Sequence, residues 1–276
     1  MKAIRYTLFL VLWPLALIRA QGTEPTTPAI PLTSVLVRSL EVPSGSSLLQ
    51  HAFPVTKSDS MHVSVLLPPG DLAPSLVSPL GETLAWNLAS NTYSCLVKPV
   101  QVDTNSPVLA QAYHFTLLNP ADGIWTLRCA FPSALTATWK GILNADFASD
   151  LGVGLFATVQ EGVVGRPVAI SLILMDGSSV LSGFQCEAQL TGGGGSPMPL
   201  AFQPMTNPQT GNTTLVAQAT PSSPGEYFAI AKLTGTLSGK PYERTAVAAF
   251  TFHAPKARIT GQFSERLEVV FPSTPD

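Results

Sequence analysis

Three cysteines are the residues of this sequence with the clearest chemical potential: Cys95, Cys129 and Cys186. Each lies on the same face of a predicted strand as large apolar residues, Cys95 with Tyr93 and Cys129 with Trp125. Each cysteine is therefore expected to face a protein core. A reactive thiolate needs an electropositive and accessible setting, and the neighbouring sequence provides none. We therefore predict a disulfide between Cys95 and Cys129, with two buried free thiols as the alternative, and a buried free thiol at Cys186.

The next candidates for a metal site are the four histidines and three aspartates that lie in predicted turns of the first half. By strand alternation His62 and His114 both face outward. They could hold a metal ion together only if their strands were neighbours and a third ligand joined them. Aspartates at turns are usually turn formers, although loop carboxylates of extracellular sandwiches can bind Ca²⁺. Neither set has the spacing of a metal motif, so we predict no metal and no cofactor. The residues are His51, His62, His114, His253, Asp71, Asp103 and Asp122.

A search for catalytic motifs yields little. The sequence has no Gly-x-Ser-x-Gly elbow, no His-Glu-x-x-His, no Cys-x-x-Cys and no Lys-bearing phosphate loop. Residues 152–157 loosely match a dinucleotide fingerprint, but they open a predicted strand instead of the helix that would receive a pyrophosphate. The glycine run 192–195 has no Lys, Ser or Thr in phosphate-loop register and is interpreted as a hairpin loop. We predict that the protein is not an enzyme.

The composition limits the class of protein. Charged residues make up only 12% of the 276 residues, against about 25% in an ordinary soluble domain. Hydrophobic residues make up 45%, which is too many for a disordered chain. The 15 basic and 17 acidic residues cannot supply the basic face that nucleic-acid binding needs. The composition favours many short strands joined by Gly- and Pro-containing turns.

The N-terminus is typical of a secretory signal, which we place at residues 1–20. Lys2 and Arg5 precede an apolar stretch of residues 6–18, too short for the ~20 residues that span a bilayer. An uncleaved N-terminal anchor is the alternative. Removal of the signal leaves 12 basic and 17 acidic residues, a net charge of −5. We therefore predict a secreted protein, extracellular or periplasmic, that neither binds nucleic acid nor inserts into a membrane after cleavage.

The mature chain begins with a Thr/Pro-rich leader at residues 21–32 and then shows period-two alternation of apolar and polar residues. Residues 62–65, 113–117 and 125–129 are predicted strands of the first half, with Trp125 facing the core. Turn residues separate the predicted strands of the second half, as in an antiparallel sandwich. These strands are residues 153–159, 167–175, 184–190, 213–219, 227–233 and 245–252.

A sequence pattern that occurs twice, a turn followed by an aromatic residue, indicates two domains. A turn ending at Gly123 precedes Trp125, and a similar turn ending at Gly225 precedes Tyr227. The offset of about 100 residues is the size of one Ig-like sandwich. We predict an all-β protein with two tandem Ig-like antiparallel β-sandwiches, at residues 33–142 and 150–254, joined by a short linker near residues 144–150. Residues 255–276 form a C-terminal tail or a truncated further module.

Short motifs of the two halves resemble known extracellular modules. Residues 63–70 (VSVLLPPG), 77–81 (VSPLG) and 123–127 (GIWTL) resemble the sandwich that follows von Willebrand A domains in hemicentin-like proteins. Residues 224–227 (PGEY) and the strand beginning at Arg244 are similar to Ig-like or fibronectin-like modules of exported bacterial proteins. The resemblance implies a secreted or surface-displayed interaction module, and it implies no catalytic residue.

We predict a non-enzymatic interaction or adhesion module that binds a protein partner. One alternative is a carbohydrate-binding accessory sandwich, which needs a row of exposed aromatic residues that Trp86 and Trp139 do not clearly form. Another is a periplasmic chaperone-like protein of two Ig-like domains. A resemblance to such chaperones would imply a basic cleft that anchors the C-terminus of a subunit. The mature charge of −5 argues against this alternative.

Overall fold

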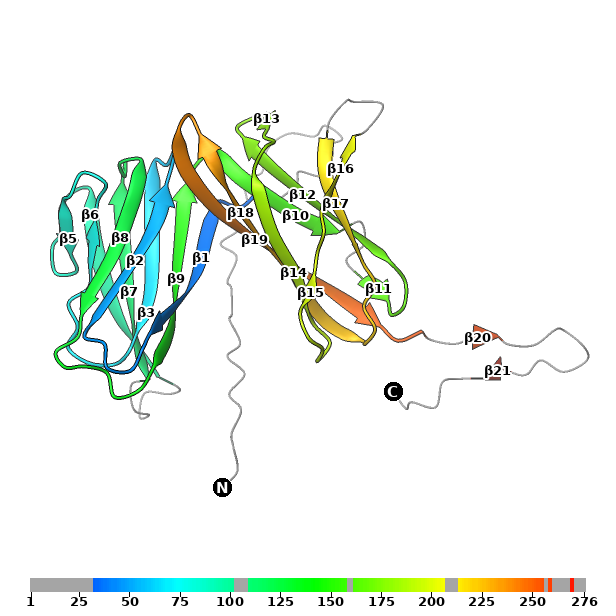
Figure 1. Cartoon of the computed structure of the whole chain (residues 1–276), viewed down its shortest axis with the longest axis horizontal. Coiled ribbons are helices and arrows are strands. Elements are labelled where there is room, and N and C mark those ends of the chain that lie inside the picture. Colours follow the sequence, from blue (N-terminus) through cyan, green and yellow to red (C-terminus); the bar gives the residue numbers. More distant parts are fainter. Residues whose placement is uncertain are drawn as a thin grey trace, which may run out of the picture. The chain divides into compact units, whose positions relative to one another are not determined.

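The computed structural model describes residues 32–101, 109–157, 161–206, 213–255, 258–259 and 269–270, which all belong to one compact unit. Every regular element in these residues is a strand (Figure 1). Over the same residues there is no helix that could cross a membrane. The predicted all-β class and its antiparallel sheets are confirmed, with one exception: β11 pairs with β19 in parallel. The predicted signal at 1–20 and nearly all of the leader at 21–32 lie outside the described residues.

The first half of the chain forms two facing sheets. Five of its strands belong to a ten-stranded sheet, in the order β1-β9-β3-β7-β6, and four form a second sheet, in the order β2-β8-β4-β5. The strands of the first group are β1 (Val35–Val42), β3 (Ser60–Leu67), β6 (Tyr93–Val100), β7 (Ala110–Leu118) and β9 (Trp139–Ala148). Those of the second group are β2 (Leu48–Val55), β4 (Ser75–Val77), β5 (Thr83–Ala85) and β8 (Gly123–Ala130).

Alternation explains why these segments pack as a sandwich. Val63 and Val65 on β3, Phe115 on β7 and Leu127 on β8 are almost completely buried. Their neighbours in the sequence point outward, so that each strand gives one face to the first core and one to solvent. Trp125 is 3% exposed, which confirms its predicted place in the core.

The second half repeats the arrangement around a separate core. One sheet has the order β10-β12-β17-β16, with β13 beside β12; the remaining strands continue the ten-stranded sheet as β15-β14-β18-β19, with β11 beside β19. The strands of the first set are β10 (Leu151–Ala157), β12 (Val168–Asp176), β13 (Ser179–Val180), β16 (Gln203–Thr206) and β17 (Thr213–Ala219). The others are β11 (Glu161–Val163), β14 (Gln185–Gly192), β15 (Met198–Pro199), β18 (Gly225–Leu237) and β19 (Lys240–His253).

The hairpin of β18 and β19 is much longer than the sequence predicted (Figure 1). Its turn consists of Ser238 and Gly239, both with positive φ, 52° and 77°. These values match the type I′ turn that suits the twist of a hairpin. Gly235 lies inside β18 because the Tyr242 ring occupies the space that a side chain would need. Gly235 and Pro241 interrupt the apolar alternation, so the sequence pattern ends the predicted strands too early.

Two hydrophobic cores agree with the two predicted sandwiches, but the strands also join the halves. Strand β9 continues to Ala148 and β10 begins at Leu151, so the predicted linker at 144–150 is largely strand. The ten-stranded sheet runs through both halves, where Val35 of β1 pairs with Thr245 of β19. The boundaries 33–142 and 150–254 remain predictions.

The predicted tail at 255–276 lies mostly outside the described residues. In the part that is described, two short strands, β20 (Arg258–Ile259) and β21 (Val269–Val270), pair with each other in antiparallel fashion. They join no other sheet of the described chain.

Candidate functional site

The cysteines face two cores, and all three are free thiols. Cys95 on β6 and Cys129 on β8 both face the first core, as predicted, and they reach it from opposite sheets, but the structure does not support the predicted bridge between them. Cys129 is buried in that core, whereas Cys95 is only partly buried on the edge strand of the large sheet. Cys186 is half-buried against the second core. Burial raises the pKa of each thiol to about 11, which disfavours the thiolate.

Alkylation tests this description of the cysteines. Protein denatured without reductant should carry three alkylated thiols. A single alkylated thiol would instead indicate a disulfide, as predicted between Cys95 and Cys129. In the folded protein at pH 8 all three should react roughly a hundredfold more slowly than an ordinary cysteine, because so little thiolate is present. Intact mass after timed iodoacetamide treatment measures both quantities.

The histidines that were predicted to face outward lie on paired strands, β3 and β7. The Nδ1 atom of His62 is 3.1 Å from the Thr116 Oγ1 atom, and the Nδ1 atom of His114 is 2.9 Å from the Ser64 Oγ atom. Asp146 of β9 lies opposite His62. Burial and the charge of Lys98 lower the pKa of His114. Burial raises the pKa of Asp146. A hydrogen bond from Asn144 and the charge of His62 lower this pKa, but by less than burial raises it.

We call His62, His114 and their hydroxyl partners Ser64 and Thr116 the outward row. Its geometry supports little chemistry. A Ser–His contact is the start of a nucleophile–base pair, but the backbone amides around it belong to strand ladders and cannot form an oxyanion hole. Within the described residues, no three His, Cys, Asp or Glu side chains come close enough to hold a metal. Of the turn aspartates, Asp122 accepts a hydrogen bond from the Lys57 amide at 2.9 Å, and Asp103 lies outside the described residues.

A more promising feature is a groove of about 610 Å³ at one end of the first sandwich. Its rim carries three leucines in contact with solvent: Leu80 is 85% exposed, Leu88 51% and Leu118 47%. Tyr93 and Trp125, both nearly buried, form its floor. Exposed leucines gathered round a concave surface, unlike single ones, mark an interaction site. We call this feature the groove; its lining includes Leu80, Glu82, Leu84, Leu88, Tyr93, Leu118 and Trp125, together with the polar residues Ser78, Ser90, Thr92 and Asn119.

Local hydrogen bonds satisfy the polar atoms of the two aromatic residues that line the groove. The Tyr93 hydroxyl donates to the Ala85 carbonyl at 2.8 Å, and the Trp125 indole N–H donates to the Ala121 carbonyl at 2.8 Å. Both aromatic rings therefore have their polar atoms satisfied within the chain. The Ser78 hydroxyl accepts hydrogen bonds from the Leu80 and Glu82 amides, which shapes the turn that carries the first leucine.

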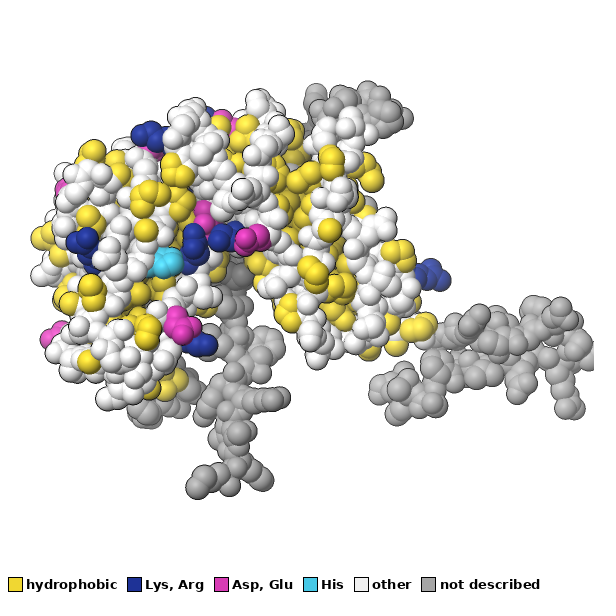
Figure 2. Space-filling model, viewed as in Figure 1, with side chains coloured by type: hydrophobic (Ala, Val, Ile, Leu, Met, Phe, Trp, Pro, Cys, Tyr) yellow, Lys and Arg dark blue, Asp and Glu magenta, His cyan; other side chains and the backbone are white. Residues whose placement is uncertain are grey.

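The groove is also nearly free of charge. Glu82 is the one ionisable carboxylate or cation of its lining. Figure 2 shows the same scarcity over one face of the molecule, where hydrophobic side chains are interspersed with uncharged ones and few carry a charge. The alternation of apolar and polar residues does not reveal the groove, because its leucines lie in turns and strand ends, outside the alternating segments. The signal that could have found it is the run of apolar residues within the predicted turns.

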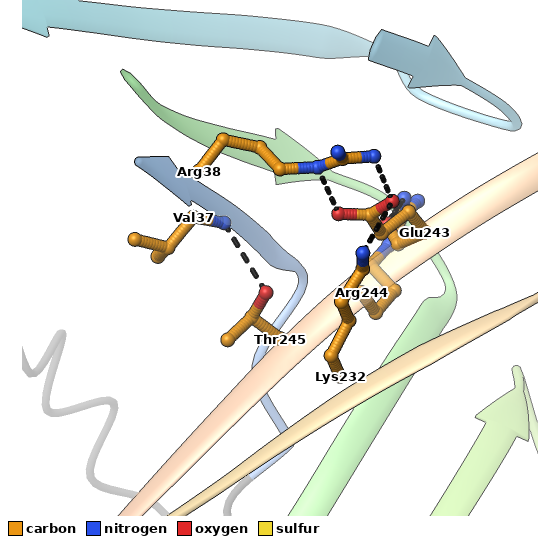
Figure 3. Close-up of polar contacts among 6 residues, drawn as sticks. All are labelled: Val37, Arg38, Lys232, Glu243, Arg244 and Thr245. Atoms are coloured by element: carbon orange, nitrogen blue, oxygen red, sulfur yellow. Dashed lines mark hydrogen bonds and ion pairs between the residues drawn. The ribbon is translucent and has the colours of Figure 1, made fainter. Parts of the chain in front are cut away.

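A second unusual site is a cluster of charges where β1 meets the β18–β19 hairpin (Figure 3). The Arg38 guanidinium holds both carboxylate oxygens of Glu243, with 2.6 Å between its Nε and Oε1 atoms. The Lys232 Nζ atom lies 3.8 Å from the same carboxylate. The Val37 amide donates to the Thr245 hydroxyl at 3.2 Å. We call the group of Arg38, Lys232, Glu243 and the neighbouring Arg244 the junction.

Arg244 is completely buried, although none of the described carboxylates forms an ion pair with it. Its guanidinium lies 4.4 Å from the centre of the Phe147 ring. It also donates to the Ser34 hydroxyl and to three backbone carbonyls, those of Thr56, Leu151 and Glu243. Burial lowers the pKa of Arg244 to about 10, so it stays charged at neutral pH. The cation thus ties residues from both halves together.

The tryptophans considered for a carbohydrate platform are both packed against the first core. Trp86 is half-buried and meets Tyr113 edge to face, with 6.4 Å between the ring centres. Trp139 is also half-buried, and its indole nitrogen is buried without a hydrogen-bond partner. Sugar binding prefers an open aromatic face, and neither ring is as exposed as the leucines of the groove.

Comparisons with known proteins show the fold and little more. No family model matches the sequence, and no curated protein matches it. A DUF4785 family protein of Legionella pneumophila is 13% identical, with a TM-score of 0.53 over 86% of this chain and 72% of that one. Identity this low shows a shared fold alone.

Two further solved structures are similar at lower scores. The Bacillus licheniformis lipase BlEst2, in its propeptide form, is 13% identical, with a TM-score of 0.42 over 92% of this chain and 46% of that one. The Escherichia coli adhesin FdeC is 15% identical, with a TM-score of 0.27 over 83% of this chain and 67% of that one. Neither score is high enough to support an argument about fold or function.

Proposed function

We propose that this chain is a non-enzymatic interaction module of a secreted or surface-displayed protein, and that it binds a protein partner in the groove. The observation that carries the proposal is the ring of exposed leucines over an aromatic floor. Apolar anchors surrounded by polar surface are where protein interfaces concentrate their affinity. The predicted export signal supports a place outside the cytosol.

The partner that fits the groove is an aliphatic segment of another protein with a Lys or Arg beside it. The walls offer Leu80, Leu88 and Leu118 for apolar contact. Glu82 is the only charge, so a basic residue next to the apolar ones would find its complement there. The predicted mature charge of −5 favours basic partners over acidic ones in the same way.

The non-enzymatic part of the proposal draws on the chemistry of the candidate nucleophiles. The thiols have raised pKa values, and the Ser64–His114 pair lies on strands whose backbone amides take part in sheet pairing. The resemblance of the first half to the sandwich that accompanies von Willebrand A domains fits an accessory module of this kind. We propose such a relationship for residues 63–127 without assigning a partner from it.

Panning a random peptide library on the folded, full-length chain tests this proposal. Enriched peptides should combine two or more aliphatic residues with a Lys or Arg. Leu88→Ser should weaken their binding about tenfold or more, which is the effect of losing one well-placed apolar anchor. Leu48→Ser is the matched control, because Leu48 of β2 is 53% exposed and lies outside the groove, where it pairs with Ala130 at the end of β8.

Two results would contradict the proposal. One is a library that enriches no sequence on the folded protein. The other is a set of peptides that bind the Leu88→Ser and Leu48→Ser variants equally well. A Glu82→Gln variant separates the two parts of the argument: it should weaken only the peptides that carry a basic residue, and leave purely aliphatic ones unchanged.

A further inference from the structure

We infer that the chain pairs with a second copy of itself along the free edge of β6, so that the two ten-stranded sheets join in antiparallel fashion. This inference goes beyond the groove and its proposed partner, and it depends on neither. It rests on the backbone groups of one edge strand, which are complementary to those of an identical strand.

Strand β6 is the last strand of the large sheet, and β7 is its neighbour on one side. Over the described residues no strand lies on its other side. The terminal strands β5, β15 and β16 have three, two and four residues, whereas β6 has eight. Very short edge strands are one way in which proteins avoid pairing between molecules. The length of β6 instead leaves an edge on which a further strand can pair.

The register with β7 shows which backbone groups face this free edge. The Leu118 amide donates to the Thr92 carbonyl at 2.9 Å, so Thr92 and every second residue after it turn their N–H and C=O groups toward β7. The residues between them turn these groups toward the free edge. They are Tyr93, Cys95, Val97 and Pro99.

These four residues can pair with their own copies about a twofold axis at Leu96. Cys95 then lies opposite Val97 of the second copy, and the two residues exchange both of their hydrogen bonds. Tyr93 lies opposite Pro99 and donates its N–H to the Pro99 carbonyl. Pro99 has no N–H to return, but the Tyr93 carbonyl already accepts a hydrogen bond from the Ser90 amide at 2.8 Å. The pairing therefore leaves no backbone group of these residues unsatisfied.

The side chains fit the same register. On the outward face Leu96, which is 55% exposed, meets Leu96 of the second copy. Ser94 meets Lys98, the one charged residue of the strand, so that no two like charges lie opposite each other. On the inward face Cys95 and Val97 are only partly buried against the first core. Each would cover the other across the axis, which completes the burial of that core edge.

Sedimentation equilibrium of the full-length chain tests the inference. The mass should approach twice that of one chain as the concentration rises into the micromolar range, as suits a small interface. Leu96→Lys should weaken self-association at least tenfold, because it places two ammonium groups opposite each other. Leu48→Lys is the matched control: Leu48 is 53% exposed but lies on β2, so this variant should associate as the unmodified chain does.

Cysteine cross-linking tests the register in a Cys95→Ser background. Leu96→Cys should form a covalent dimer under mild oxidation, because residue 96 faces its own copy with about 4.5 Å between the Cα atoms. Ser94→Cys alone should not, since it faces Lys98. A mixture of Ser94→Cys and Lys98→Cys proteins should cross-link.

Three results would overturn the inference. A mass of one chain at every concentration up to about 100 µM would leave the edge to a strand of another protein. Equal association of the Leu96→Lys and Leu48→Lys variants would place the contact on another surface. Cross-links in Ser94→Cys protein with none in Leu96→Cys protein would exclude the twofold axis at Leu96.

Discussion

An Arg244→Ala variant should lose about 3–5 kcal/mol of unfolding free energy, because a large buried side chain is truncated and the acceptors around it lose a charged donor. The substitution removes five contacts at once: hydrogen bonds to Ser34, Leu151, Thr56 and Glu243, and the contact with the Phe147 ring. The carbonyls of Thr56 and Glu243 lose the donor that Arg244 supplies, the Leu151 carbonyl keeps only the Ser34 hydroxyl as its side-chain donor, and a cavity remains where the side chain was. Urea denaturation followed by tryptophan fluorescence measures the loss.

Arg166→Ala is the matched control for this variant, because Arg166 is exposed on the second half of the chain. Its effect should stay within about 0.5 kcal/mol. An Arg244→Lys variant should fall between the two, since an ammonium group keeps the charge but cannot form the planar set of hydrogen bonds. A loss below about 1 kcal/mol in Arg244→Ala protein would mean that the cation does not hold the halves together.

The second large effect is expected at Glu243. A Glu243→Ala variant should lose about 2–4 kcal/mol, because Arg38 and Lys232 then face one another without their shared carboxylate. The Arg38 side chain is 30% exposed, and solvent reduces the cost relative to a fully buried pair. Equilibrium denaturation gives the loss.

The control for Glu243 is an exposed ion pair of the same chain. Glu41 and Lys140 are 3.9 Å apart with side chains 61% and 78% exposed, so Glu41→Ala should cost no more than about 0.5 kcal/mol. A double-mutant cycle with Arg38→Ala should give a coupling of about 1–3 kcal/mol with Glu243→Ala. Equal losses in the Glu41 and Glu243 variants would show that the junction is no more than a surface salt bridge.

The strands could be predicted because their signal is local. The predicted strand at residues 213–219 forms β17 with those bounds, and the one at residues 167–175 differs from β12 by one position at each end. The long hairpin was underestimated because Gly235 and Pro241 look like strand ends in a sequence. They are accommodated only because β18 and β19 support each other over their full length.

The junction and the groove could not be predicted, because both depend on which strands become neighbours. Glu243 and Arg244 are adjacent in the sequence and look like a polar strand end. Only the pairing of β19 with β1 gives Glu243 its partner Arg38, 205 residues away. The groove likewise combines turns from positions near Leu80 and near Leu118, which no short sequence window contains.

The cysteines show what strand alternation cannot predict. Alternation placed Cys95 and Cys129 correctly toward one core, but it carries no information on the distance between them. In the same way His62 and His114 were expected to face outward, and the pairing of their strands brings them to hydroxyl partners, Thr116 and Ser64, that no motif marked.

The central claim is that the groove is the binding surface of this module. An NMR titration of ¹⁵N-labelled protein with the tightest peptide from the library tests it most directly. Saturable shifts are expected at the amides of residues 78–93 and 117–125, with the outward row of His62 and His114 unaffected. Shifts confined to that row or to the second sandwich, with none near Leu88, would contradict the claim.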